Sequence, residues 1–425
     1  MGVCAGVGKG GTGDTWAFVD KRTNEQVAIK FLRRPLPKVL LENIKREFLI
    51  QAELGFGHEN VIRAYEAVLT PTHLCLVMEY AKGGPLTAHV ADKWKQAQAN
   101  GLFLSEDEAR FFFKQFLSAV NYCHQHRVVH RDLKLDNTLL DDSSPPVIKI
   151  CDFGFAKTWS EEANMYTQIG TPVYMSPELM NQATKEKGYD GRSVDVWAAG
   201  ILLLVMLLGS FPFDHTEHPD PNTSEAHLEV WLQQVSKRWS DVPHMAEAVK
   251  KLSPEIKDLL NRIFVIDAGK RVTIQQIKRH PWYNKPLPPG YQEKWDELKT
   301  KQEKLDKWYK EHPLGDNALV TAMNEEIERM VEQSTKVYDP EDEGERGGGD
   351  GDAYWMIDLR DKQVCILLVF FSCFSLCSRS DPPLARTKPP ASFRRPFCER
   401  THPFFLRTSS HLSSCKRVRA GLTYI

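Results

Sequence analysis

Two short polar runs have the residue types and spacing that phosphoryl transfer requires. The first is His130-Arg131-Asp132-Leu133-Lys134-Leu135-Asp136-Asn137, and the second is Asp152-Phe153-Gly154 after a short β-branched stretch at 147–150. Phosphoryl transfer needs a carboxylate to orient the attacking hydroxyl, a cation at the γ-phosphate and oxygen ligands for Mg²⁺. A solvated polar turn would explain neither run. The residue types therefore point to phosphoryl transfer, carried by Asp132, Lys134, Asn137 and Asp152.

A glycine-rich segment near the amino terminus could cradle a polyphosphate. It reads Gly8-Lys9-Gly10-Gly11-Thr12-Gly13, and missing side chains let backbone amides approach phosphate oxygens. Dinucleotide-binding turns use the same spacing but need a helix directly after the glycines. Here 15–19 has strand composition and 21–24 has turn composition. We therefore predict a β-hairpin at this point.

The elements that must position these residues change character along the chain. Residues 1–80 hold strand-like runs at 25–31 and 74–78, interrupted by one helix at about 37–54. From Ser105 to Trp282 the pattern is mainly helical, and Ser105 to Glu108 form a capping-box sequence. Two amphipathic stretches follow in 283–335. A small sheet with one helix, joined to a larger helical part, is predicted.

Composition limits the alternatives. The 425 residues contain 42% hydrophobic residues and have a net charge of −1, which permits a large folded core and gives no global attraction to nucleic acid. The nine cysteines show no CxxC zinc spacing, and no secretory signal precedes them, so we expect a reducing, intracellular compartment. The longest apolar run, 364–377, is shorter than the ~20 residues of a spanning helix. We expect no membrane span.

These motifs, in this order, resemble those of eukaryotic protein kinases. The glycine-rich segment precedes Val27-Ala28-Ile29-Lys30, and the two polar runs precede Ser176-Pro177-Glu178. The segments Leu133-Lys134 and Gly170-Thr171-Pro172 are similar to those of serine/threonine kinases rather than tyrosine kinases. The resemblance implies an α+β, bilobed protein-kinase fold, with a small antiparallel β-sheet lobe carrying one helix and a larger, mainly helical lobe. It also implies that Arg271 pairs with Glu178.

A closer resemblance is to the plant and green-algal sucrose-non-fermenting-related kinases of the osmotic-stress and abscisic-acid subfamily. It is carried by the segments at 68–74, 105–113, 139–141, 189–191 and 261–267. Members of that subfamily carry a regulatory helix and an acidic patch after the kinase domain. The amphipathic stretch at 317–335, with Leu319, Met323, Ile327, Met330 and Val331 on one face, and the acidic run at 339–352 stand in the same order.

The resemblance implies a division of the chain and a set of functional residues. The small lobe would span 1–80, the large lobe 81–283, possible regulatory helices 284–338 and an acidic linker 339–352, with 353–425 a disordered tail or a read-through of the gene model. The catalytic residues would be Asp132, Lys134, Lys30, Glu47 and Thr171. ATP would be bound by Gly8, Lys9, Gly10, Gly11, Thr12, Gly13, Thr15, Ala28, Lys30, Met78, Glu79, Ala81, Leu139 and Asp152, and Mg²⁺ by Asn137 and Asp152.

The resemblance also implies a phosphorylation switch and a set of partners. Thr167 stands where similar kinases carry an activating phosphate, and Arg131 would bind that phosphate. The expected partners are protein substrates, an upstream activating kinase and a regulatory phosphatase. We expect no nucleic-acid partner, a monomer, and a cytoplasmic or also nuclear location. Asp136 is expected to attract a basic residue before the phosphoacceptor, as are Glu106 and Glu108 if they face the cleft.

Several residues depart from the family pattern. Thr12 replaces an aromatic residue, Thr15 replaces a valine and Pro85 replaces a ribose-contacting glutamate, and each change could weaken nucleotide binding. Few residues precede Gly8, so the first edge strand is expected to be short or missing. The expected function is a non-specific serine/threonine protein kinase acting in stress signalling. The alternative is a kinase-like scaffold or allosteric binder with little turnover.

Overall fold

The computed structural model describes residues 2–10, 13–20, 23–96, 102–158, 165, 170–181, 188–215, 220, 223–311 and 318–336. The expected acidic linker at 339–352, the apolar run at 364–377 and the rest of 353–425 lie outside this part of the chain.

The small lobe is built on one five-stranded antiparallel sheet. Its strands are β1 (Gly2–Gly10), β2 (Gly13–Val19), β3 (Gln26–Arg33), β4 (Ala64–Leu69) and β5 (His73–Glu79), in the order β1-β2-β3-β5-β4. β1 and β2 form the predicted hairpin, with Gly8 opposite Thr15 and Gly10 opposite Gly13. Gly13 cannot carry a side chain without movement, because an added Cβ would lie 2.3 Å from the Phe31 carbonyl oxygen. Strand β1 spans 9 residues, so the expectation of a short or missing first strand is wrong.

The helix predicted at about 37–54 packs against this sheet. A 3₁₀ turn, η1 (Lys38–Leu40), leads into α1 (Leu41–Leu54). Ile44 and Phe48 of α1 are 1% and 0% exposed and share an apolar cluster with Leu32 and Leu76 of the sheet. This burial fixes which face of α1 lies on the sheet, and it brings Glu47 of α1 close to Lys30 on β3.

The large lobe is mainly helical with short strands. The strands are β6 (Gly84–Pro85), β7 (Val128–Val129), β8 (Thr138–Leu140), β9 (Ile148–Ile150) and β10 (Lys157–Thr158). The longer helices are α2 (Leu86–Gln96), α3 (Glu106–Gln125), α6 (Gly191–Leu208), α7 (Ser224–Ser236) and α9 (Pro254–Ile263). The shorter elements are η2 (Leu135–Asn137), η3 (Pro172–Tyr174), α4 (Pro177–Met180), η4 (Trp239–Asp241), η5 (Pro243–Met245), α8 (Ala246–Lys251), α10 (Ile274–Lys278) and α11 (Pro281–Asn284).

Helices α3 and α6 form the centre of the large lobe. Ser105 caps α3 by accepting a hydrogen bond from the Glu108 amide, and Phe111, Phe112 and Phe113 are all at most 1% exposed. Helix α6 is apolar and long enough to pass for a membrane span by composition, but 89% of that window is buried within the protein. It is therefore a core helix here, and its fully buried aspartate, Asp195, needs polar partners.

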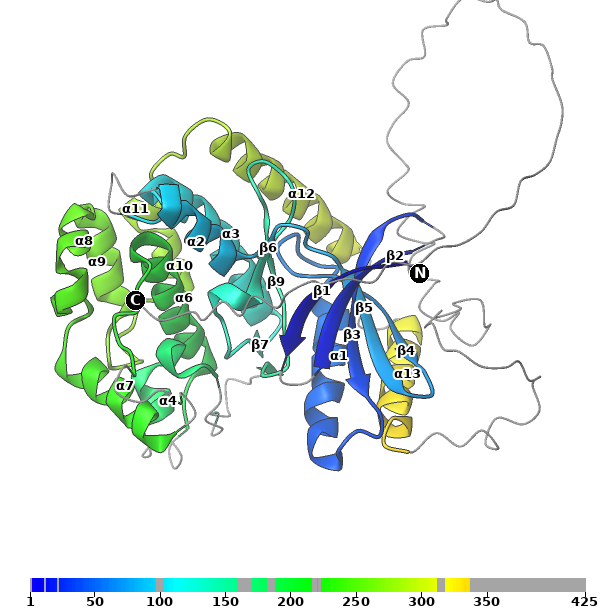
Figure 1. The fold of residues 1–425 in the computed structure, drawn as a ribbon. Coiled ribbons are helices and arrows are strands. Elements are labelled where there is room, and N and C mark those ends of the chain that lie inside the picture. The colour runs from blue at the N-terminus through cyan, green and yellow to red at the C-terminus, as the bar shows by residue number, and fades with distance from the viewer. Residues whose placement is uncertain are drawn as a thin grey trace, which may run out of the picture. The chain divides into compact units, whose positions relative to one another are not determined.

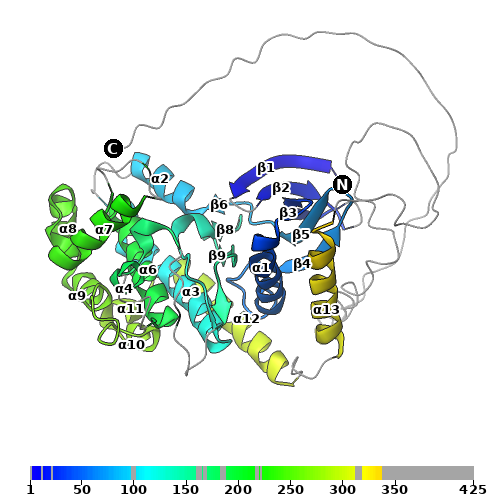
Figure 2. The ribbon, with the colours of Figure 1, turned by 90° about the horizontal axis from the view of Figure 1, so that it is seen from below.

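Among the described residues, the large lobe is followed by two helices, α12 (Tyr291–Glu311) and α13 (Ala318–Gln333). Helix α12 contacts α3, whereas α13 returns to the small lobe and lies beside α1 and β4 (Figures 1 and 2). Met323, Ile327, Met330 and Val331 of α13 join the same cluster as Ile44 and Phe48. The predicted apolar face of this helix is therefore covered by the small lobe, although the Leu319 side chain lies outside the described residues.

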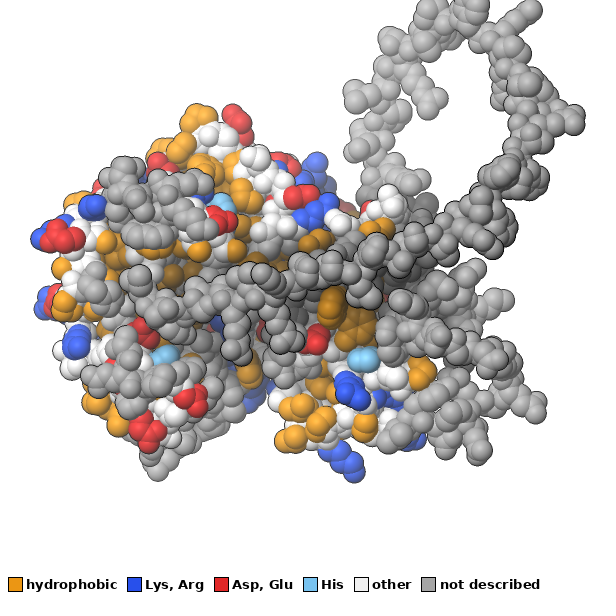
Figure 3. Space-filling model, viewed as in Figure 1, with side chains coloured by type: hydrophobic (Ala, Val, Ile, Leu, Met, Phe, Trp, Pro, Cys, Tyr) orange, Lys and Arg blue, Asp and Glu red, His pale blue; other side chains and the backbone are white. Residues whose placement is uncertain are grey.

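Charged side chains of both signs are scattered over the face of the described residues drawn in Figure 3. That distribution agrees with the net charge of −1.

Candidate active site

Asp132 lies at the centre of a hydrogen-bonded cluster. Its Oδ1 accepts a hydrogen bond from the Thr171 hydroxyl at 2.9 Å, and its Oδ2 accepts from the Lys134 ammonium at 2.8 Å and the Asn137 amide at 3.0 Å. Lys134 also donates to the Thr171 hydroxyl at 3.0 Å. Asp132 is 3% exposed, so these contacts fix the orientation of a carboxylate that few waters reach.

The backbone that carries Asp132 is held by Asp195 from α6. Asp195 Oδ1 accepts from the Arg131 amide at 2.9 Å, and Oδ2 accepts from the His130 amide at 3.0 Å and from His124 Nε2 at 2.8 Å. Burial raises the pKa of Asp195, but His124 and the other donors outweigh it and hold the pKa below its ordinary value. The sequence analysis assigned this residue no role in the site. An aspartate within an apolar helix was the signal that could have identified it.

Lys30 and Glu47 form a buried ion pair. Lys30 Nζ and Glu47 Oε1 are 2.5 Å apart, and the two residues are 7% and 4% exposed. Burial lowers the pKa of Lys30, but the carboxylates of Glu47 and Asp152 outweigh it and leave the pKa above its ordinary value. The structure therefore brings a cation from the small lobe close to Asp152, the first residue of the second polar run.

Asp152 is held by the residues that follow it. Its Oδ1 accepts from the Gly154 amide at 3.3 Å, and its backbone has a left-handed φ of 65°. Phe153 is fully buried, with its ring 4.9 Å from the His130 ring. The burial of Phe153 anchors this segment beside the loop that carries Asp132.

The residues expected to bind the nucleotide come from both lobes. In the sheet, Ala28 pairs with Ala17 and Met78, and Lys30 pairs with Thr15. Ala81 is 5% exposed after β5, and Leu139 lies in β8 of the three-stranded sheet β6-β8-β9. Gly8, Lys9 and Gly10 belong to β1, but their side-chain surroundings, like Gly11 and Thr12 altogether, lie outside the described residues.

Glu79 uses its carboxylate for structure. Its Oε1 is 2.7 Å from Lys149 Nζ, and its Oε2 accepts from the Arg63 amide at 3.3 Å. Lys149 is 5% exposed on β9, so this pair connects the end of β5 to the strand that precedes Asp152. The sequence analysis missed Lys149, although a lysine within the apolar stretch at 147–150 was a usable signal.

The acidic residues considered for substrate charge differ in their surroundings. Glu106 accepts hydrogen bonds from Ser253 and from the Trp282 indole, and Glu108 pairs with His89 and Lys93. Both carboxylates are therefore used within the large lobe. Asp136 is exposed and accepts a hydrogen bond from the Thr87 hydroxyl at 2.9 Å.

Arg131 is buried among neutral acceptors. Its Nε donates to the Phe155 carbonyl at 2.8 Å and its Nη1 to the Tyr189 hydroxyl at 3.3 Å. Tyr189 forms an isolated antiparallel bridge with Met165. Thr167 lies outside the described residues.

The expected pair of Arg271 and Glu178 is present and bidentate, with N–O distances of 2.6 and 2.8 Å.

Comparisons with known proteins agree with this arrangement. The protein kinase domain family matches residues 3–283. The chain is 41% identical over 282 residues to the serine/threonine-protein kinase SRK2E of Arabidopsis thaliana, covering 66% of this chain and 71% of that protein. It is 40% identical over 328 residues to the serine/threonine-protein kinase SAPK3 of Oryza sativa, covering 77% and 86%. The serine/threonine-protein kinase SRK2A of Physcomitrium patens is 40% identical over 282 residues, which cover 66% of this chain and 73% of that protein. The chain therefore belongs to the protein kinase family, as a serine/threonine protein kinase of the sucrose-non-fermenting-related group.

Proposed function

We propose that Asp132 orients the serine or threonine hydroxyl of a protein substrate for attack on the γ-phosphate of ATP. The observation that supports this most directly is the Asp132 cluster, in which Thr171, Lys134 and Asn137 all donate to one buried carboxylate. An oriented carboxylate can accept the hydroxyl proton, and the neighbouring Lys134 ammonium can neutralise charge on the transferred group. ATP is the phosphate donor of this family.

The phosphates of ATP would be positioned from the small lobe. Lys30 would bind the α- and β-phosphates, and Glu47 would hold the Lys30 ammonium in place. The β1–β2 hairpin would cover the phosphates with its backbone, while Ala28 and Leu139 would contact the adenine from the two lobes. The ion pair of Lys30 with Glu47 at 2.5 Å supports this assignment.

Asn137 and Asp152 would hold Mg²⁺. Both offer side-chain oxygens, which this hard cation prefers. The Asn137 amide nitrogen faces Asp132, so its oxygen remains available, and among the described residues only Oδ1 of Asp152 has a hydrogen-bond donor. The donor set therefore fits the ion. When bound, Mg²⁺ would neutralise phosphate charge.

A second proposal concerns the switch. Phosphate on Thr167 would pair with Arg131, which has no carboxylate partner among the described residues. Met165, two residues before Thr167, bridges to Tyr189, whose hydroxyl contacts Arg131. This proximity supports the idea that a phosphorylated Thr167 orders its segment. An upstream kinase would add the phosphate and a phosphatase would remove it.

The wider role follows from the resemblance. We propose that the protein acts as a monomer in stress signalling, like the subfamily it resembles, on substrates with a basic residue before the phosphoacceptor. Asp136 supports the substrate preference because it is exposed. A peptide array that shows no preference for Arg or Lys on the amino-terminal side of the phosphoacceptor would reject the proposed substrate preference.

The catalytic assignment is tested by phosphate incorporation into a basic peptide by the full chain. Asp132→Asn and Asp152→Ala should each lower kcat by at least about a hundredfold, corresponding to ~3 kcal/mol, with the circular dichroism spectrum unchanged. Wild-type turnover in either folded variant would overturn the assignment. The kinase-like scaffold would instead show the same negligible incorporation in the parent and in both variants.

The switch is tested separately, after incubation with an activating kinase. Thr167→Ala should prevent activation, and mass spectrometry should find phosphate on Thr167 of the active parent. Thr158→Ala, which removes an exposed threonine earlier in the same segment, is the matched control and should be activated normally. Full activation of Thr167→Ala would show that the phosphosite is elsewhere.

A further inference from the structure

Helix α12 is attached to the large lobe along its first half. The Tyr291 ring lies 4.8 Å from the Phe111 ring of α3, and the Lys114 ammonium of α3 lies 5.7 Å from the Trp295 ring. Leu298 is 5% exposed. These aromatic and apolar contacts fix the start of α12 on α3.

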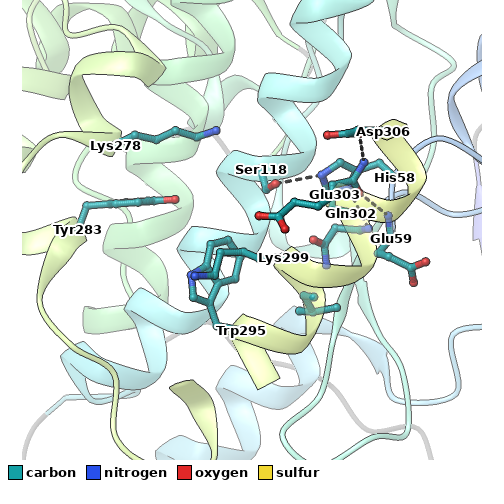
Figure 4. A pocket seen from close by; sticks show the side chains of 12 residues that line it. His58, Glu59, Ser118, Lys278, Tyr283, Trp295, Lys299, Gln302, Glu303 and Asp306 are labelled. Carbon is teal, nitrogen blue, oxygen red and sulfur yellow. Dashed lines mark hydrogen bonds between the residues drawn. The ribbon is translucent and has the colours of Figure 1, made fainter. Parts of the chain in front are cut away.

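In the second half of α12, the side chain of Gln302 reaches the small lobe. Gln302 donates from Nε2 to the Gly57 carbonyl at 2.9 Å, and its Oε1 accepts from the Glu59 amide at 3.3 Å. Asp306, one turn further along α12, accepts from the same Nε2 at 2.7 Å. Gln302 therefore contacts the loop between α1 and β4 through both ends of its amide (Figure 4).

The same loop rests on α3 from its other side. A Cβ added to Gly57 would lie 1.8 Å from the Tyr122 hydroxyl, which shows how closely the loop approaches α3. His58 bonds the Ser118 hydroxyl of α3 through Nε2 at 3.0 Å, and the Asn60 amide donates to His58 Nδ1 at 3.0 Å. The loop thus lies between α3 and α12.

A cavity of about 270 Å³ separates α12 from part of this surface. It is lined by His58, Ser118 and Tyr283 on one side and by Leu298, Gln302 and other α12 residues on the other. Because this space is not filled by side chains, apolar packing contributes little there. Beside this cavity, the hydrogen bonds of Gln302 join α12 directly to the loop.

We propose that Gln302 is a positioning residue for catalysis, which holds the α1–β4 loop and through it the end of α1. Glu47 lies on α1, about two turns before the helix ends at Leu54. Fixing the loop restricts movement of that end of α1 relative to the large lobe and so favours the conformation in which Glu47 meets Lys30. The inference rests on the proposed role of the Lys30–Glu47 pair.

The test compares two glutamines of α12 in the full chain. Gln292 also accepts a backbone N–H at 3.3 Å, from Leu287, and also donates to an aspartate four residues later, at 3.0 Å. It differs from Gln302 because Leu287 belongs to the segment leading into α12 rather than to the small lobe. Gln302→Ala should lower kcat by about fivefold with the peptide KM within about twofold of the parent. Gln292→Ala should keep the parent kcat.

A double-mutant cycle separates positioning from general destabilisation. Glu47→Gln weakens the pair directly, so adding Gln302→Ala should lower kcat by less than about twofold further. The positioning role would be overturned if the kcat losses of Glu47→Gln and Gln302→Ala multiplied in the double variant. It would also be overturned if Gln302→Ala had the same kcat as Gln292→Ala. Should Gln302→Ala fail to fold, Gln302→Glu keeps the acceptor but loses the donor to Gly57, and the same kcat loss is expected.

The cycle also tells the two proposals apart. A Glu47→Gln variant with parental kcat would contradict the proposed role of the Lys30–Glu47 pair, and the role of Gln302 with it. An impaired Glu47→Gln variant alongside an unimpaired Gln302→Ala variant would contradict the positioning role alone.

Discussion

The hydroxyl of Thr171 donates a hydrogen bond to Oδ1 of Asp132 at 2.9 Å, across 39 residues of sequence. Oδ2 of the same carboxylate accepts from Lys134 and Asn137. Thr171 therefore connects the segment before Ser176-Pro177-Glu178 to the residue proposed to orient the substrate. Its contact occupies one oxygen of Asp132 and leaves the other to Lys134 and Asn137.

Thr171→Ala should lower kcat by about tenfold to a hundredfold, because it removes a hydrogen bond to a charged group worth roughly 1.5–3 kcal/mol. Thr171→Ser keeps the hydroxyl and is the matched control. Steady-state assays of both variants, each with and without an activating kinase, would check this. A Thr171→Ala variant that recovers full activity on activation would contradict a direct contact role.

The Lys30–Glu47 pair gives a second prediction. Glu47→Gln leaves the buried Lys30 ammonium with a neutral partner in place of a carboxylate, so both ATP binding and turnover should suffer. We expect kcat/KM for ATP to fall by at least about tenfold. Glu53→Gln, at an exposed position near the end of the same helix, is the control. Equal kcat/KM values for the two variants would argue against the pair.

Packing of α13 on α1 gives a third prediction, about stability. Ile327 is 2% exposed in the cluster that contains Ile44 and Phe48. Ile327→Ala should lower the free energy of unfolding by about 2–4 kcal/mol, through lost burial and a residual cavity. Glu325→Ala changes an exposed side chain on α13 and should alter it by less than about 0.5 kcal/mol. Urea unfolding followed by circular dichroism would measure both values.

The buried imidazole of His58 gives a fourth prediction, about pH. Burial, then the charge of Lys278, lowers the pKa of His58 from 6.5 to about 3. The unfolded chain therefore binds a proton below about pH 6.5 that the folded protein does not accept until about pH 3. The contribution of His58 to the free energy of unfolding is therefore fully present above pH 6.5 and is lost as the pH falls. The free energy of unfolding should fall by about 2 kcal/mol between pH 7 and pH 5.

His58→Gln should remove the His58 contribution to the pH dependence of the free energy of unfolding. Ser118→Ala removes the hydrogen bond to the imidazole but keeps the imidazole itself, so this variant should keep the parent's pH dependence. Urea unfolding at pH 7 and pH 5 would provide the comparison. If the difference between the two pH values were the same in His58→Gln as in the parent, His58 would not be the group responsible.

The sequence by itself determined the reaction class and much of the local structure. The residues from His130 to Asn137 and Asp152-Phe153-Gly154 indicated the chemistry because they lie close together in sequence, where spacing is informative. The β1–β2 hairpin and helix α1 followed from strand composition and from helical spacing. These features depend on contacts between near neighbours, which a single sequence records.

Only the tertiary structure decided how distant residues meet. Asp195 holds the amides of His130 and Arg131, Lys149 meets Glu79, and Gln302 holds the loop after α1. No local pattern records these contacts, because each depends on how two separately folded elements pack and on which buried polar group needs a partner. The sequence supplied the functional groups, and the packing of α6, β9 and α12 determined where they lie.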